Sequence, residues 1–144
     1  KGSGHSISKA DEVRPFKGAL SDGFPGIYKN SIKWDIASLY PSVILQYEIF
    51  SSKKDPEGNF LNLVKTFRNL RLEYKRKAKT DEKFEAMQSS FKILINSMYG
   101  ACSTAGLNFN YPRGAEEITA KGREILHKAI VWATGKEYIE KQVV

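Results

Sequence analysis

The stretch Lys33–Ile44 reads Lys-Trp-Asp-Ile-Ala-Ser-Leu-Tyr-Pro-Ser-Val-Ile. This apolar run is interrupted by one carboxylate, Asp35, and has the pattern of a buried strand that ends in a tight turn and then starts a helix. Proline suits the first helical turn and pushes the residue before it toward extended geometry, so the change to helix is predicted around Pro41. A carboxylate at such a strand end can hold a divalent cation, and the N–H groups of the helix start can face phosphate oxygens.

The context of Asp35 favours one of two interpretations. An isolated aspartate at a strand end usually caps a turn. The residues Asp35–Ile44, however, closely resemble the first palm motif (motif A) of family B DNA polymerases, commonly written D-x-x-S-L-Y-P-S-I-I. The stretch Lys92–Gly100 reads Lys-Ile-Leu-Ile-Asn-Ser-Met-Tyr-Gly and resembles the fingers motif of that family (motif B), K-x-x-x-N-S-x-Y-G. Two unrelated motifs in the family's order make the resemblance specific.

The bulk composition is that of a globular protein with an anionic partner. The 144 residues fit one domain or a piece of a larger one, and 41% are hydrophobic and 27% charged. No run is long enough to cross a membrane. The formal net charge of +7 and the pI of about 9.4 favour an anionic partner without separating nucleic acid from an acidic protein or a membrane surface. The single cysteine, Cys102, rules out an internal disulfide, His5 and His127 are too widely separated for a zinc-like cluster, and an intracellular location is expected.

The resemblance implies an α+β fold: part of a polymerase palm, with β strands and helices, and an inserted antiparallel two-helix fingers subdomain. Residues 1–15 are expected to be a leader or flexible segment, and residues 16–50 the first part of the palm with motif A. Residues 51–105 then form the fingers helical pair with motif B, and residues 106–144 the second part of the palm.

The palm segments contain further local signals. Turn residues between apolar positions after Phe16 predict an irregular hairpin leading into the Asp35 strand. The residues Phe16–Ala19 resemble the Y-x-G-G/A element of the family, and a plain glycine turn explains them equally well. The helix after motif A is expected to run to about Phe50.

A long helix is predicted from Gly114 to about Thr134, ended by Gly135. Within it, Ile118–Arg123 resembles the family segment I-T-x-x-G-R, which returns the chain from the fingers to the palm. We assign that segment an architectural role and no catalytic one.

The middle of the chain predicts a basic amphipathic helix starting at Phe60. Apolar residues recur there at three- and four-residue spacings: Phe60, Leu63, Val64, Phe67, Leu70 and Tyr74. Its other side is basic, and a solvated face is the ordinary interpretation. The pair Arg71 and Lys75, however, resembles the R-x-x-x-K of the family's fingers helix, where both side chains hold the incoming triphosphate. The neighbouring cations Arg76, Lys77 and Lys79 are interpreted as solvated or as nonspecific DNA contacts.

A second helix is predicted from about Lys83 to Tyr99, ended by Gly100, and antiparallel to the first. Lys92, Asn96 and Tyr99 follow at i, i+4 and i+7 and therefore share one face, which suits a nucleotide. Taken alone, Lys92 would be a surface lysine and Tyr99 a half-buried aromatic residue. Phe84, Met87, Phe91, Leu94 or Ile95, and Met98 are expected to pack against the first helix.

The resemblance implies a role for each residue of the predicted site. Asp35, assisted by the backbone carbonyl of Ile36, would bind Mg²⁺, of which the complete enzyme uses two ions. The other implied roles concern the nucleotide.

The triphosphate would meet the backbone N–H groups around Ser38, Leu39 and Tyr40, and its charge would be neutralised by Arg71, Lys75 and Lys92. The Tyr40 side chain would lie under the sugar and disfavour a 2′-hydroxyl. Asn96 would help to order the nucleotide, and Tyr99 and Gly100 would face the nascent base pair.

The predicted function is therefore part of a template-directed DNA polymerase that adds deoxynucleotides to a primer 3′ end. Its implied partners are primer–template DNA, dNTP and the remainder of the polymerase. The family motif Y-x-D-T-D-S, which supplies the second catalytic carboxylate, is not in the sequence, so this chain alone is not expected to extend a primer. Two alternatives stay open: a noncatalytic DNA-binding module derived from a polymerase, and a basic helical domain that docks on an acidic protein.

Overall fold

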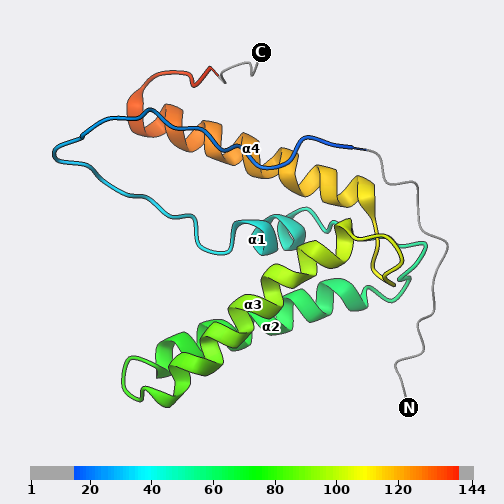
Figure 1. Cartoon of the computed structure of the whole chain (residues 1–144). Coiled ribbons are helices and arrows are strands. Elements are labelled where there is room, and N and C mark those ends of the chain that lie inside the picture. Colours follow the sequence, from blue (N-terminus) through cyan, green and yellow to red (C-terminus); the bar gives the residue numbers. More distant parts are fainter. Residues whose placement is uncertain (1–14, 140–144) are drawn as a thin grey trace.

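Four helices make up the regular structure of residues 15–139, the part of the chain that the computed structural model describes. The helices are α1 (Leu39–Gln46), α2 (Asn59–Lys77), α3 (Lys83–Ser103) and α4 (Pro112–Thr134) (Figure 1). No strand occurs within these described residues, so the prediction of an α+β palm with β strands is wrong. The expected leader, residues 1–15, lies outside the described residues except for its last position.

The segment 15–38 has no regular secondary structure, so both the predicted hairpin and the strand carrying Asp35 are wrong. In Figure 1 this segment runs along α4, loops away from it and returns to α1. Its first contact with α4 uses side chains: the carbonyl of Lys17 accepts hydrogen bonds from Thr119 Oγ1 (3.1 Å) and Arg123 Nη1 (2.7 Å). A strand completes its ladder only with the N–H and C=O groups of a neighbouring strand, and none lies beside this segment in the described chain.

The helix after motif A is shorter than predicted. Pro41 lies in its first turn, as expected, but α1 ends at Gln46 rather than near Phe50. The backbone N–H of Ile49 bonds to the carbonyl of Ile44 in a turn that buries the Ile49 side chain to 3% exposure. The helix thus ends just before Glu48, which has a positive φ (50°) that interrupts a right-handed helix, and the turn that follows brings Ile49 into the core.

The antiparallel pair formed by α2 and α3 confirms the predicted amphipathic helices (Figure 1). Aromatic rings join the two helices, with centroid distances of 6.0 Å for Phe67–Phe91 and 5.7 Å for Tyr74–Phe84. Of the two residues left open, Ile95 is buried and Leu94 is exposed. Met98 is buried as predicted, whereas Met87, predicted to pack, is 40% exposed.

Gly100 does not end the second helix of the pair. Helix α3 continues through it to Ser103, and the N–H of Thr104 bonds to the Gly100 carbonyl. A glycine inside a helix costs roughly 1 kcal/mol, a cost that packing can offset. Cys102, in the extra turn, is 1% exposed in the core, and burial raises the pKa of its thiol to about 12. Cys102 is therefore a small packing residue of the core.

The hydrophobic core lies where the four helices meet. It contains Val43 and Ile44 from α1, Phe60 and Val64 from α2, Met98 and Cys102 from α3, Ala115 and Ile118 from α4, and Ile49. The core thus holds the start of α1, which belongs to the motif A stretch, against α2, α3 and α4.

Helix α4 begins slightly before the predicted Gly114 and ends at Thr134 as predicted, with Gly135 in the left-handed conformation (φ 66°).

Asp55, in the turn before α2, stabilises the start of that helix. Its side chain is buried, and its two oxygens accept hydrogen bonds from the backbone N–H groups of Asn59 (3.0 Å) and Phe60 (2.8 Å). Burial by itself raises the pKa of this carboxyl, but the hydrogen bonds from Phe60 and Asn59 together outweigh burial and hold the pKa below its ordinary value of 3.8.

Replacing Asp55 with alanine is expected to lower the free energy of unfolding by about 1–3 kcal/mol near neutral pH, because two N–H groups lose their acceptor. Since the folded pKa is depressed, the carboxylate contributes its full stability above 3.8, and this contribution disappears as the pH falls through the folded pKa. Urea unfolding at about pH 7 and about pH 2 measures both effects. The exposed Glu117→Ala serves as control. A deficit of equal size at both pH values would contradict the role of the charge.

Candidate nucleotide-binding site

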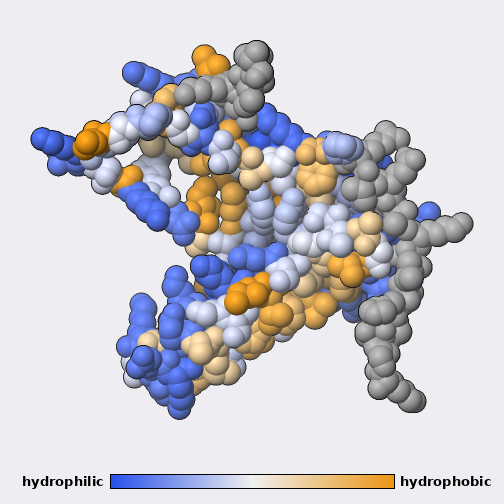
Figure 2. Space-filling view, in the orientation of Figure 1, coloured by the Kyte–Doolittle hydropathy of each residue, from blue (hydrophilic) through white to orange (hydrophobic). Residues whose placement is uncertain are grey.

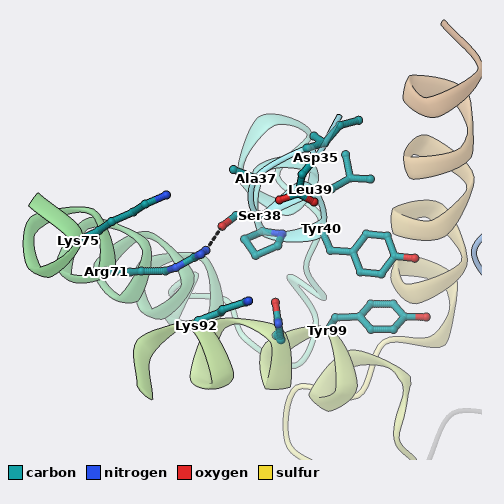
Figure 3. A pocket seen from close by; sticks show the side chains of 12 residues that line it. Asp35, Ala37, Ser38, Leu39, Tyr40, Arg71, Lys75, Lys92 and Tyr99 are labelled. Atoms are coloured by element: carbon teal, nitrogen blue, oxygen red, sulfur yellow. Dashed lines mark hydrogen bonds between the residues drawn. The ribbon is translucent and has the colours of Figure 1, made fainter. Parts of the chain in front are cut away.

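A pocket of about 530 Å³ lies between the start of α1 and the facing sides of α2 and α3 (Figure 3). Figure 2 shows the molecule hollowed on this side, with hydrophilic side chains on the wall formed by the helical pair. The lining residues are Asp35, Ile36, Ala37, Ser38, Leu39, Tyr40, Pro41, Arg71, Lys75, Lys92, Asn96 and Tyr99. A space of this size is typical of small-molecule sites.

Two helices supply the cations of the pocket. Arg71 and Lys75 lie one turn apart on α2, and Lys92 lies on α3 (Figure 3). Because residues four apart on a helix share a face, the antiparallel packing of α2 on α3 directs these three side chains toward the same space. Asp35 is the one carboxylate among the lining residues. The pocket therefore has an excess of positive charge that suits a polyanion.

The start of α1 forms the third side of the pocket. Ser38 precedes the helix in the left-handed conformation (φ 53°), which costs a residue with a side chain about 1 kcal/mol. Asp35, Ile36 and Ala37, which come just before this turn, line the same pocket as the start of α1. The first N–H groups of a helix have no acceptor within the helix, so those of Leu39 and Tyr40 are suited to an anion.

Arg71 joins α2 to the start of α1. Its Nη1 donates a short hydrogen bond to Ser38 Oγ, drawn as a dashed line in Figure 3. Its Nε is buried and has no hydrogen-bond partner within the described part of the chain. A buried donor without an acceptor is costly, by about 1–3 kcal/mol, so this guanidinium is ready to bind a ligand oxygen.

An aromatic pair closes the end of the pocket near α4. The rings of Tyr40 and Tyr99 have centroids 4.8 Å apart and are tilted by 42°. Burial raises the pKa of the Tyr99 hydroxyl, and the nearby Tyr40 and Cys102 add to this effect, so Tyr99 stays neutral at physiological pH. Asn96 lies one turn before Tyr99 on α3, so an amide and a neutral phenol follow Lys92 along one face of this helix.

The structure brings together all of the predicted site residues except Gly100, which lies inside α3 and does not line the pocket. Ala37 and Pro41 also line the pocket and were not singled out from the sequence, although both belong to the quoted motif A stretch. The bond between Ser38 and Arg71 was missed as well. These residues are 33 positions apart, so no local pattern could have indicated their contact. The roles assigned to the site residues stay predictions.

The pocket offers few ligands for a metal by itself. No cluster of three His, Cys, Asp or Glu residues that could hold a metal ion occurs among residues 15–139. Asp35 is exposed at the pocket, next to the backbone of Ile36. Mg²⁺ commonly uses one or two carboxylates together with phosphate oxygens of a substrate. Asp35 therefore fits a magnesium site that a bound triphosphate would complete, and the described residues by themselves offer too few ligands for one.

A family model described as DNA polymerase family B matches residues 49–143. This chain belongs to DNA polymerase family B. The matched region includes α2, α3 and α4 of this family B chain and begins after the motif A stretch. The predicted resemblance to family B is thereby confirmed.

Curated relatives extend the similarity over most of this family B chain. DNA polymerase II of Escherichia coli K12 is 28% identical over 163 residues, which cover 94% of this chain and 20% of the relative. DNA polymerase 1 of Saccharolobus solfataricus is 29% identical over 148 residues, covering 80% of this chain and 17% of the relative. The DNA polymerase alpha catalytic subunit of Oryza sativa subsp. japonica is 32% identical over 125 residues, with coverages of 73% and 8%. The chain thus spans about a fifth or less of these relatives.

No solved structure matches this family B chain significantly. Within residues 15–139, none of the helices is both long and apolar enough to cross a membrane. The family assignment therefore rests on the sequence matches.

Proposed function

We propose that this chain is the nucleotide-binding part of a template-directed DNA polymerase, which adds deoxynucleotides to a primer 3′ end. The observation that carries the proposal is the pocket itself. Three cations from α2 and α3 face one carboxylate, the start of a helix and an aromatic pair. These are the groups needed for a triphosphate, a metal-bound phosphate oxygen, and a sugar and base. Family membership supports the same assignment.

In this proposal the phosphates lie between the cations and the start of α1. Arg71 offers a fork of donors, and its buried Nε gains an acceptor when a phosphate binds. Lys75 and Lys92 supply charge from the two facing helices. The N–H groups of Leu39 and Tyr40 add donors at the positive end of α1.

The sugar and base lie toward the aromatic end of the pocket. Tyr40 lies under the deoxyribose and leaves no room for a 2′-hydroxyl, which selects dNTP. Asn96 orders the nucleotide, and Tyr99 and Gly100 face the nascent base pair with primer–template DNA. The neutral Tyr99 phenol suits contact with an uncharged base.

Asp35 and the backbone carbonyl of Ile36 are the groups of this chain that would hold magnesium when a nucleotide is bound. Bound Mg²⁺ supplies Lewis-acid stabilisation of the transferring phosphoryl group. Two-metal transfer needs a further carboxylate, and Asp35 is the one carboxylate of the described pocket. We therefore propose that the second carboxylate belongs to the remainder of the polymerase, and that the 144-residue chain alone binds without extending a primer.

The proposed domain division follows from the same assignment. Helices α2 and α3 belong to the fingers, residues 51–105, and the segments 16–50 and 106–144 belong to the palm. Helix α4 packs against α1 and α3, so it joins the two parts of the palm to the base of the fingers.

Binding to primer–template DNA in the presence of each nucleotide tests the proposal. With the purified chain and Mg²⁺, the templated dNTP is expected to tighten DNA binding by roughly tenfold, and a mismatched dNTP is not, because only a polymerase site reads the template. Fluorescence anisotropy of labelled DNA at low salt measures this difference. Binding that ignores the nucleotide would favour a noncatalytic DNA-binding module, which the single carboxylate of the pocket also permits.

A further inference from the structure

Gly122 lies in the middle of α4, outside the pocket lining, and yet it contacts a pocket residue. It is buried, and a Cβ atom built on it would lie 3.1 Å from Cε1 and 3.7 Å from Cδ1 of Tyr40. The same atom would lie 3.6 Å from Cδ2 of Leu39. The shortest of these distances is closer than ordinary van der Waals contact. The Tyr40 ring can therefore approach α4 this closely only because residue 122 has no side chain.

A second neighbour limits the Tyr40 ring within the pocket. Its centroid is 4.8 Å from that of Tyr99. In Figure 3 both rings lie next to α4, and Arg71, Lys75 and Lys92 lie on the other side of the pocket. A ring that moves away from α4 must therefore move into the space where the proposed nucleotide binds.

We infer that Gly122 is a positioning residue for Tyr40, and that through Tyr40 it sets the room left for the sugar of a bound nucleotide. This inference rests on the proposed function, which places a deoxyribose against Tyr40. A methyl group at position 122 displaces the ring into the pocket, since packed interiors accommodate an added carbon by shifting side chains. A ribose carries one more hydroxyl than a deoxyribose at this place. Narrowing the space beside the Tyr40 ring therefore lowers kcat/KM more for a ribonucleotide than for a deoxynucleotide.

The complete product of the gene that encodes this chain, carrying Gly122→Ala, tests the inference by steady-state incorporation. The KM for the templated dNTP is expected to rise roughly fivefold, with a smaller change in kcat. The ratio of kcat/KM for dNTP to kcat/KM for the matching ribonucleotide is expected to rise as well. Gly23→Ala is the matched control, because the same added Cβ has no atom within 4 Å there. An unchanged ratio with a lower kcat would overturn the inference.

Repeating the substitution in a Tyr40→Ala background separates positioning from a general effect on α4. With the ring removed, Gly122→Ala is expected to leave the KM and the sugar ratio unchanged, because the added methyl has no ring to displace. Alanine is also the better helix former, so weakening of α4 does not explain a defect in the single variant. An equal rise in KM in both backgrounds would show that Gly122 acts on something other than Tyr40.

A readout that needs no nucleotide distinguishes this inference from the proposed function. If the unmodified protein neither binds nor incorporates nucleotides, the proposed function fails and the sugar-selection part fails with it. The claim that Gly122 positions the Tyr40 ring is then tested by urea unfolding of the same variants. Non-additive effects of Gly122→Ala and Tyr40→Ala on the unfolding midpoint are expected, and additive effects would overturn it.

Discussion

Replacing Asp35 with asparagine is expected to lower the rate of nucleotide incorporation by the complete gene product by at least ~10³-fold, because metal-ion stabilisation of phosphoryl transfer is worth several kcal/mol and each 1.36 kcal/mol is a factor of ten. The amide has nearly the same size as the carboxylate but lacks its negative charge, and Mg²⁺ is commonly held by one or two carboxylates. Asp35 is the one carboxylate that lines the described pocket, so no neighbour in it can take over this role. Single-turnover primer extension with Mg²⁺ measures the loss.

The same variant is expected to fold as the unmodified protein does. Asp35 is exposed, and surface substitutions of this kind usually change the free energy of unfolding by no more than about 0.5 kcal/mol. The control Glu117→Gln removes an exposed carboxylate from α4, and its extension rate should be unchanged. Full activity of Asp35→Asn would contradict the assignment of Asp35 to the metal. A chain of 144 residues that extends primers alone, and loses this activity with Asp35→Ala, would disprove the proposal that the second carboxylate lies elsewhere.

Replacing Lys92 with alanine is expected to raise the KM for dNTP by roughly 10- to 100-fold, because a charge-assisted hydrogen bond to a phosphate is worth about 1.5–3 kcal/mol. Lys92 lies on α3, opposite Arg71 and Lys75 on α2, so in the proposed site its loss would leave α2 as the one source of cations for the phosphates. The difference in KM between the variant and the unmodified protein should shrink as the salt concentration rises, because salt screens the cations of the unmodified protein. Incorporation measured over a range of dNTP concentrations tests this expectation.

Two further variants show whether the charge or its position matters at Lys92. Lys92→Arg keeps the charge and should recover part of the affinity. Lys53→Ala removes an exposed cation from the turn between α1 and α2, outside the pocket, and should leave the KM for dNTP unchanged. A similar rise in KM for both alanine variants would point to the overall charge of the chain instead of a phosphate contact.

The candidate site could be predicted residue by residue to a large extent, because its members belong to short stretches that resemble motifs of family B. Lys92, Asn96 and Tyr99 share a face through the helical repeat alone, and all three line the pocket. Asp35 and Tyr40 belong to one quoted stretch. Gly100 is the exception, since it lies inside α3 and is not among the residues that line the pocket.

Contacts between distant parts of the chain could not be predicted in this way. The bond from Arg71 to Ser38 joins α2 to the start of α1, and the close approach of Gly122 to Tyr40 joins α4 to α1. Both depend on how the helices pack around Ile44, Val64 and Ile118. Spacing within one helix contains no information about such packing.

By itself the sequence determined the helices α2, α3 and α4, the stop of α4 at Gly135, and the residues that share each helix face. Helical hydrogen bonds join residues four apart, so the local order of apolar and polar side chains is enough to specify them. Only the tertiary structure decided that the segment before α1 forms no strand, that α1 ends before the buried Ile49, and that the motif A stretch meets α2 and α3 in one pocket. A strand and a pocket both need partners from elsewhere in the chain, and their presence depends on packing.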